Sequence, residues 1–242
     1  MSDGEMQMSD LLINGYGNFS GGTFEKVRIN GLGKVNGDLD CRLFITNGDS
    51  VVEGNVQTQT VKVSGSSAIE GKLKADETKV NGQLTTEGDV HTQNITLNGT
   101  AQVKGNFIAD QADIRGTLKV DEDLEAESVV IKGVFIIKGL LNAGNIQVEL
   151  LGNAKAKEIG GEKIVVKKNS FALNKWLKSF FADKTLQAEV IEGDDIELEY
   201  THAGIVRGKN VKIGPGCKVD VVEYQNSFDQ HDQAEVKESK QV

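Results

Sequence analysis

The sequence predicts an all-β protein, a right-handed parallel β-helix (solenoid) with about 17 residues per turn, plus a helical insertion. Three observations carry this prediction. Glycine returns at a fixed spacing, apolar β-branched side chains lie two residues apart inside each repeat, and the positions between them are polar. Such a period is typical of repeats that bury a shared core by stacking, and crossovers between parallel strands are nearly always right-handed.

The repeat is clearest in two neighbouring stretches, VKVSGSSAIEGKLKADE (61–77) and TKVNGQLTTEGDVHTQN (78–94), which carry glycine at their fifth and eleventh positions. Asparagine usually precedes the first glycine of the unit. Because Asn-Gly tolerates a positive φ, we predict that these glycines are structural corners and that stacked asparagines form a hydrogen-bond ladder. The predicted corner glycines are Gly31, Gly48, Gly65, Gly82, Gly99, Gly116 and Gly133.

Within each repeat, inward residues alternate with polar ones. Val61 and Val63, or Leu73 and Ala75, lie two apart, which is the period of a strand. We therefore expect three short strands per turn, bent at corners and stacked roughly 4.8 Å above the previous turn. A coil of this kind has a thin core shared along its length, which fits a chain with only 38% hydrophobic residues.

The repeat pattern predicts five segments. They are a disordered N-terminus (1–10), a main β-helix (11–162), an amphipathic helical insertion (163–185), a second and looser β-helical segment (186–224) and a disordered tail (225–242).

The insertion carries one apolar stripe at helical spacing, formed by Leu173, Trp176, Leu177, Phe180 and Phe181. One hypothesis makes this helix a cap that packs on the turn 129–145, whose outward positions are unusually apolar, or a docking site for a partner. The alternative is a basic amphipathic helix on an anionic membrane surface. It is less favoured because the chain is acidic elsewhere, with a net charge of −9.

Composition excludes several classes of protein. The acidic balance argues against nucleic acid as a partner. The N-terminus lacks the pattern of a signal peptide, and no apolar run is long enough to span a membrane. Cys41 and Cys217 lie too far apart in the sequence to suggest a disulfide framework. We expect a cytoplasmic protein, with the inner face of the membrane as an alternative location.

The sequence contains no recognisable catalytic constellation. His91, His202 and His231 share no ligand spacing with cysteine or carboxylate, and no GxSxG, HExxH, CxxC or Walker A pattern occurs. Cys41 falls in the column of small inward residues, and nothing in the sequence activates Cys217. We therefore predict no enzymatic activity, no cofactor and no metal site.

The rhythm from Val63 to Leu73, V-x-G-x-[IV]-x-G-x-[LV], resembles that of bactofilins, which are bacterial polymer-forming cytoskeletal proteins with a right-handed β-helix core. The resemblance covers most of 11–162. It implies filaments formed by end-to-end contact without nucleotide, and scaffold roles in envelope, cell-shape or motility machinery, including flagellar assembly. This chain departs from the family pattern in its single proline and in its N-terminus, which does not resemble a membrane-targeting segment.

The leading hypothesis is a structural protein that self-assembles through the ends of its coil. The expected partners are copies of itself, other bactofilin-like proteins or a membrane-associated protein, and not nucleic acid. Two alternatives remain, an adaptor that does not polymerise and a carbohydrate-binding β-helix. Besides the second coil, the candidate interface residues are Leu11, Leu12, Phe19 and Phe24.

Overall fold

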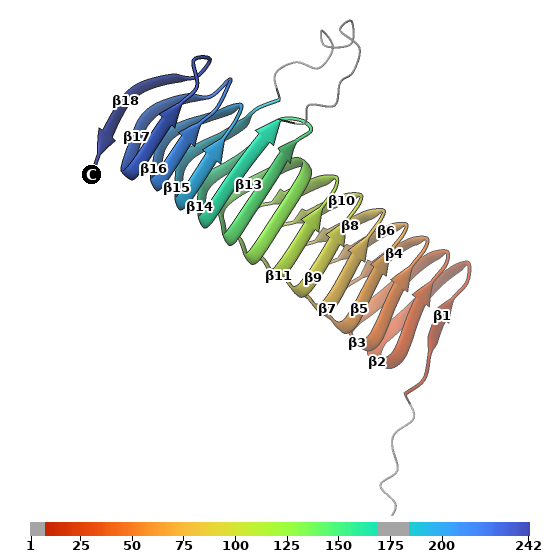
Figure 1. Cartoon of the computed structure of the whole chain (residues 1–242). Helices are drawn as coiled ribbons and strands as arrows, with labels where there is room; N and C mark the ends of the chain where they lie inside the picture. The colour runs from red at the N-terminus through yellow and green to blue at the C-terminus, as the bar shows by residue number, and fades with distance from the viewer. Residues whose placement is uncertain (1–7, 169–183) are drawn as a thin grey trace, which may run out of the picture. The chain divides into compact units, whose positions relative to one another are not determined.

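The computed structural model describes residues 8–168 and 184–242, and these residues form eighteen β-strands and no helix (Figure 1). The strands belong to two compact units that divide between Gly105 and Asn106. Unit 1 contains β1 (Leu11–Ile13), β2 (Tyr16–Ile29), β3 (Leu32–Thr46), β4 (Asp49–Val52), β5 (Val56–Val63), β6 (Ser66–Ile69), β7 (Leu73–Val80), β8 (Gln83–Thr86), β9 (Val90–Leu97) and β10 (Thr100–Val103). Unit 2 contains β11 (Phe107–Ile114), β12 (Thr117–Val120), β13 (Leu124–Leu150), β14 (Ala154–Lys168), β15 (Leu186–Leu198), β16 (Thr201–Ile213), β17 (Lys218–Gln230) and β18 (Glu235–Gln241).

Unit 1 is a regular parallel β-solenoid. Val56 of β5 lies opposite Leu73 of β7, which in turn lies opposite Val90 of β9. In these eight-residue strands, Asp76 and the equivalent residues of the turns before and after it are not paired. Each long strand therefore pairs in two parts. Together with the four-residue strands β4, β6 and β8, this gives three paired segments per turn.

Unit 2 is a parallel β-solenoid with less even turns. Facing residues are 15 apart between β15 and β16, as at Glu192 and Arg207, and 16 apart between Arg207 and Glu223 of β17. The register also shifts within the β13–β14 pair and within the β16–β17 pair. The parallel β-solenoid predicted from the repeat is thus confirmed in both units.

The core of each unit is a set of stacked inward columns. In unit 1, Val63, Val80 and Leu97 follow one another at the same position in successive turns, and each is fully buried. Burying one such side chain contributes about 1.5–3 kcal/mol relative to leaving it in water. Because each turn supplies only a few inward residues, a turn gains most of its burial from its two neighbours.

The corner glycines are required for a reason that the sequence did not indicate. None of the seven has a positive φ; among the described glycines that conformation occurs at Gly15, Gly22, Gly37 and Gly216. Instead, a Cβ on Gly65 would collide with the carbonyl oxygen of Gly48, one turn earlier. The same collision recurs at Gly31, Gly48, Gly82, Gly99 and Gly133. Stacked turns approach so closely here that only glycine fits.

The predicted asparagine ladder is present beside these corners. Asn30 Nδ2 donates to Asn14 Oδ1 at 2.7 Å, and Asn47 Nδ2 donates to Asn30 Oδ1 at 2.8 Å. The ladder stops where serine occupies the equivalent position, and resumes where Asn98 donates to Asn81 at 3.0 Å. Each amide thus binds its own equivalent in the neighbouring turn.

Two expectations about the C-terminal half need correction. Residues 163–168 belong to strand β14 and not to a helical insertion, and the predicted stripe of Leu173, Trp176, Leu177, Phe180 and Phe181 lies outside the described residues. Residues 225–242 were expected to be disordered, but they contain the end of β17 and all of β18. β18 was not evident from its polar sequence, because this strand is held by backbone pairing with β17 along one side while most of its side chains remain exposed.

Replacing a corner glycine should destabilise the solenoid. We expect Gly65→Ala to lower the free energy of unfolding by about 2–3 kcal/mol, because the new methyl group must push apart two turns held by backbone hydrogen bonds. Chemical denaturation followed by circular dichroism measures the change.

Gly160→Ala is the matched control, because the nearest atom to its Cβ would be the side-chain oxygen of Asn142 at 3.2 Å, which can move aside. Equal losses of stability in the two variants would contradict the close-approach explanation.

Candidate self-assembly interface

Unit 1 ends in a strand edge whose outer side is paired with no strand in the part of the chain that the structure describes. β1 pairs only with residues 27–29 of β2. Residues 16–24 of β2 pair with β3 along one side, and no described strand is registered against their other side. We call this segment, Tyr16–Phe24, the N-terminal edge. Such an edge presents a row of backbone N–H and C=O groups that can pair with another chain.

Two phenylalanines stand at the open end of the core. Phe19 lies opposite Val35 and Phe24 lies opposite Cys41, so both rings continue columns of inward residues. Val35 and Cys41 are buried, whereas both rings are only half-buried. The Phe19 ring lies directly over Gly17, where a Cβ would collide with it. The two rings thus cover part of the core and leave the rest of their surface to a partner.

Exposed apolar side chains surround the N-terminal edge. Tyr16 is 88% exposed, Leu12 55% and Leu32 53%, and Met8 is exposed beside them in sequence. These four are the exposed large hydrophobic residues of the described part of unit 1. The nine residues of the edge, YGNFSGGTF, carry no charge. Clustered apolar exposure of this kind marks an interaction surface more often than a solvated one.

The four interface residues predicted from the sequence all lie in β1 and β2. Leu12 is exposed, Phe19 and Phe24 belong to the N-terminal edge, and Leu11 is half-buried in β1. The prediction missed Tyr16 and Leu32. Tyr16 and Leu32 occupy an outward position of the repeat. In the next three turns the same position is held by Asp49, Ser66 and Gln83. Comparing this position across the repeats would have revealed both residues, because it is polar in the later turns and apolar in the first two.

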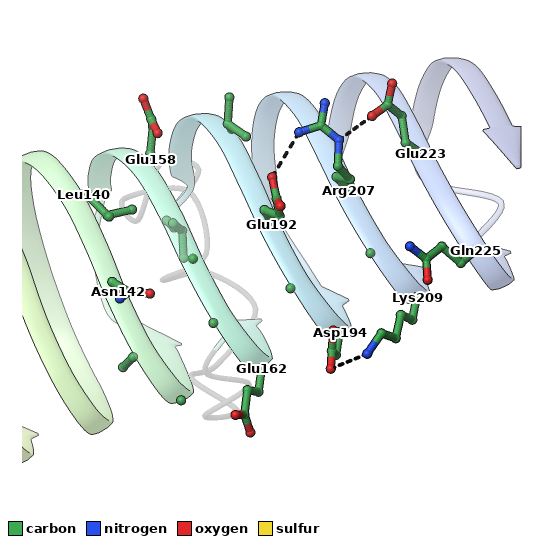
Figure 2. Close-up of a pocket in the computed structure, with 18 of the residues that line it drawn as sticks. Leu140, Asn142, Glu158, Glu162, Glu192, Asp194, Arg207, Lys209, Glu223 and Gln225 are labelled. Carbon is green, nitrogen blue, oxygen red and sulfur yellow. Dashed lines mark hydrogen bonds and ion pairs between the residues drawn. The ribbon is translucent and has the colours of Figure 1, made fainter. Parts of the chain in front are cut away.

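A groove on unit 2 carries both acidic and basic side chains, and three of its carboxylates are held by basic partners. It measures about 770 Å³ and is lined by residues of β13 to β17 and by Val242. Arg207 donates to Glu192 at 3.0 Å and also to Glu223, and Lys209 donates to Asp194 at 2.8 Å (Figure 2). Hydrogen bonds from Lys240 and from Arg207 lower the pKa of the Glu223 carboxyl. Carboxylates paired in this way are poorly placed to act as a general acid and base.

Both cysteines are buried and unreactive by position. Cys41 is 4% exposed, and its thiol contacts the Thr58 hydroxyl at 3.6 Å. Cys217 is 1% exposed, and burial raises the pKa of its thiol to about 11. No group of three or more His, Cys, Asp or Glu side chains within 8–168 and 184–242 is arranged to hold a metal ion. The residues that the structure describes include no helix long and apolar enough to cross a bilayer.

The geometry defines a class of protein, a repetitive β-solenoid with an uncovered and apolar strand edge. Comparison with known proteins identifies the family. A family model described as Bactofilin: Polymer-forming cytoskeletal matches residues 48–118. The uncharacterized protein YhbE of Bacillus subtilis (strain 168) is 59% identical over 219 residues, which cover 90% of this chain and 92% of that protein.

A second Bacillus subtilis (strain 168) protein, the uncharacterized protein YhbF, is 41% identical over 102 residues, or 41% of this chain and 40% of that protein. No solved structure matches this chain. The chain belongs to the bactofilin family, a structural family of polymer-forming cytoskeletal proteins.

The raised pKa of Cys217 predicts a specific loss of stability in alkali. Between the ordinary thiol pKa of 9.0 and about 11, the unfolded chain releases the thiol proton while the folded chain retains it. Stability contributed by the neutral buried thiol is therefore present below pH 9 and declines as the pH rises to 11. In urea denaturation at pH 8–11, we expect Cys217→Ala to weaken this decline relative to wild type. Val219→Ala, at a buried residue that does not titrate, is the control. Identical pH profiles for wild type and Cys217→Ala would contradict the assignment.

Proposed function

We propose that this chain is a non-catalytic structural protomer that self-assembles through its solenoid ends, without nucleotide, into a cytoskeletal scaffold. The observation that carries the proposal is the N-terminal edge, where unpaired backbone, two half-buried phenylalanine rings and an exposed apolar rim coincide. A second copy placed against this edge satisfies the backbone groups and buries the rings in one step.

Several properties support assembly by simple contact. The sequence has no phosphate-binding loop, and the groups that form the edge are backbone amides and apolar side chains. Their burial is driven by the hydrophobic effect and strand pairing, neither of which needs a nucleotide to be hydrolysed. The family's polymer-forming character points in the same direction.

The cellular role follows from the family more than from the site. A stiff, repetitive protomer is suited to support envelope, cell-shape or motility machinery, including a flagellum, from the cytoplasmic side. Other bactofilin-like chains with a similar edge are the natural further partners, and an association with the inner face of the membrane through a bound protein is compatible with this role.

An adaptor role is the second candidate, and one feature of unit 2 favours it. In unit 2, Ile136 and Leu151 are 40% and 43% exposed. Val134 lies beside them against Gly152. These three side chains form a lateral apolar surface that could hold a partner protein while the strand edges remain engaged elsewhere.

Tyr16→Glu tests the proposed function most cleanly. Because Tyr16 is almost fully exposed, the change should leave the fold intact while placing a charge in the apolar interface. We expect wild-type protein to form assemblies without nucleotide, and Tyr16→Glu to weaken their association at least tenfold, which corresponds to about 1.4 kcal/mol. Sedimentation velocity and negative-stain electron microscopy give the two readouts.

The control is Gln57→Glu, which adds the same charge on the exposed side of β5, away from the N-terminal edge. Phe24→Glu should abolish association more completely, and circular dichroism checks that it still folds. The proposal fails if wild-type protein stays monomeric at high concentration, or if Tyr16→Glu and Gln57→Glu assemble equally well.

A further inference from the structure

The lateral apolar surface of unit 2 is built by stacking. Val134 N–H donates to Gly116 O at 2.9 Å. Leu151 N–H makes the equivalent bond to Gly133 O at 3.3 Å, so Leu151 stacks on Val134 in the next turn. Ile136 follows Val134 by two residues in β13 and therefore lies on the same outward side of the strand. The three side chains form one continuous surface.

Polar side chains border this surface. In the turn before it, Thr117 faces Val134 and Lys119 faces Ile136. In the turn after it, Lys155 faces Ile136. The outward positions are thus apolar only over a short distance along unit 2, and this distance ends where the chain departs from the regular repeat.

The departure lies directly beside Leu151. A three-residue corner joins Leu150 to Ala154. In the next turn the facing residues are Lys168 and Leu186, and seventeen residues join them. The residue that would stack on Leu151 is therefore the first residue of a long connection that replaces a short corner.

Both ends of this connection are anchored at the same corner. Lys168 N–H donates to Glu199 Oε2 at 3.1 Å, and Lys168 Nζ lies 3.9 Å from the centroid of the Tyr200 ring. Thr185 is buried, and its N–H donates to Asn153 Oδ1 at 3.3 Å. The residues between these anchors are consequently tethered on both sides next to the lateral apolar surface.

The connection contains the apolar stripe predicted from the sequence, although the stripe itself lies outside the described residues. Its five side chains share one face at helical spacing and are Leu173, Trp176, Leu177, Phe180 and Phe181. The stripe begins five residues after Lys168, a span of at most about 18 Å, whereas successive turns are roughly 4.8 Å apart. A segment tethered this closely has an effective concentration in about the millimolar range, which favours it over a separate partner.

From these observations we propose that the apolar stripe of this connection packs on the lateral apolar surface of the same chain. The contact buries Val134, Ile136 and Leu151 and removes the two phenylalanines and the tryptophan of the stripe from water. Lys175 and Lys178 lie off the stripe and stay solvated. A surface filled in this way is not free to hold the partner of an adaptor. The proposal goes beyond self-assembly and does not depend on the N-terminal edge.

Trp176 provides the test, because it is the only tryptophan of the chain. In the full-length protein we expect its fluorescence to be shifted to shorter wavelength than in the urea-unfolded chain, and to be protected from quenching by acrylamide. Both properties should be unchanged on dilution, and they should be the same in the Tyr16→Glu chain, in which assembly is weakened.

Leu151→Lys combined with Ile136→Glu should release the stripe. The emission of Trp176 should shift to that of the unfolded chain, and its protection from acrylamide should be lost, while the circular dichroism of the solenoid is retained. The fold should tolerate the glutamate because Lys119 and Lys155 face it from the neighbouring turns. Gln83→Lys with Gln102→Glu is the control, since it places the same charges at the equivalent positions of the repeat in unit 1.

A cross-linking experiment locates the contact. A short bifunctional maleimide should join Leu151→Cys to Leu177→Cys within one chain. The native cysteines are buried, so the introduced thiols are the ones that react. Glu125→Cys paired with Leu177→Cys is the control, because Glu125 is exposed on the part of β13 that precedes the corner at Gly133.

Three results would overturn the proposal. The first is wild-type Trp176 fluorescence that equals that of the unfolded chain. The second is burial of Trp176 that survives Leu151→Lys with Ile136→Glu, or cross-linking no more efficient at Leu151→Cys than at Glu125→Cys. The third is burial that is lost on dilution, which would show that a second copy covers the stripe. None of these readouts reports on assembly through the N-terminal edge, so the two proposals can fail independently.

Discussion

The stacking of each residue on its own equivalent in the next turn is the constraint on which the rest of this structure depends. Because parallel strands pair at a nearly constant step, each residue faces the equivalent residue of the neighbouring turn. Glycine must follow glycine where the backbones of successive turns approach, as at Gly48 and Gly65. Asparagine amides can then bind one another, and in one column of unit 2 the charges alternate in sign, from Glu192 through Arg207 to Glu223. The inward columns form a continuous core for the same reason.

The same constraint explains why the ends matter. An interior turn has a neighbour on each side, whereas no described strand pairs with the outer side of Tyr16–Phe24 or of β18. The strand edges of the two units differ in their side chains. The N-terminal edge has no charge and carries Phe19 and Phe24 at the limit of the core. β18 is almost wholly exposed, and its lysines are paired to the turn beneath.

Structural features that repeat along the chain could be predicted from the sequence, whereas features that occur once could not. The period, the inward columns and the asparagine ladder could be predicted because seven or more copies of each position can be read against one another. The role of the corner glycines was misassigned, since close approach and positive φ select the same residue. Tyr16 was overlooked because a single exposed aromatic residue in a repeat resembles ordinary variation. β18 was missed because an edge strand held by backbone pairing and ion pairs has a polar sequence, like that of a disordered tail.

Hydrogen exchange of the backbone amides in Tyr16–Phe24, measured on the wild-type chain as its concentration is raised without nucleotide, tests the central claim most directly. These amides belong to a strand paired along one side, so only those that point away from β3 depend on a second copy for protection. If the chain assembles through this edge, these outward amides become protected as assembly proceeds, while amides in β5 and β7 exchange at an unchanged rate. Assembly with no gain of protection in Tyr16–Phe24 would contradict the claim.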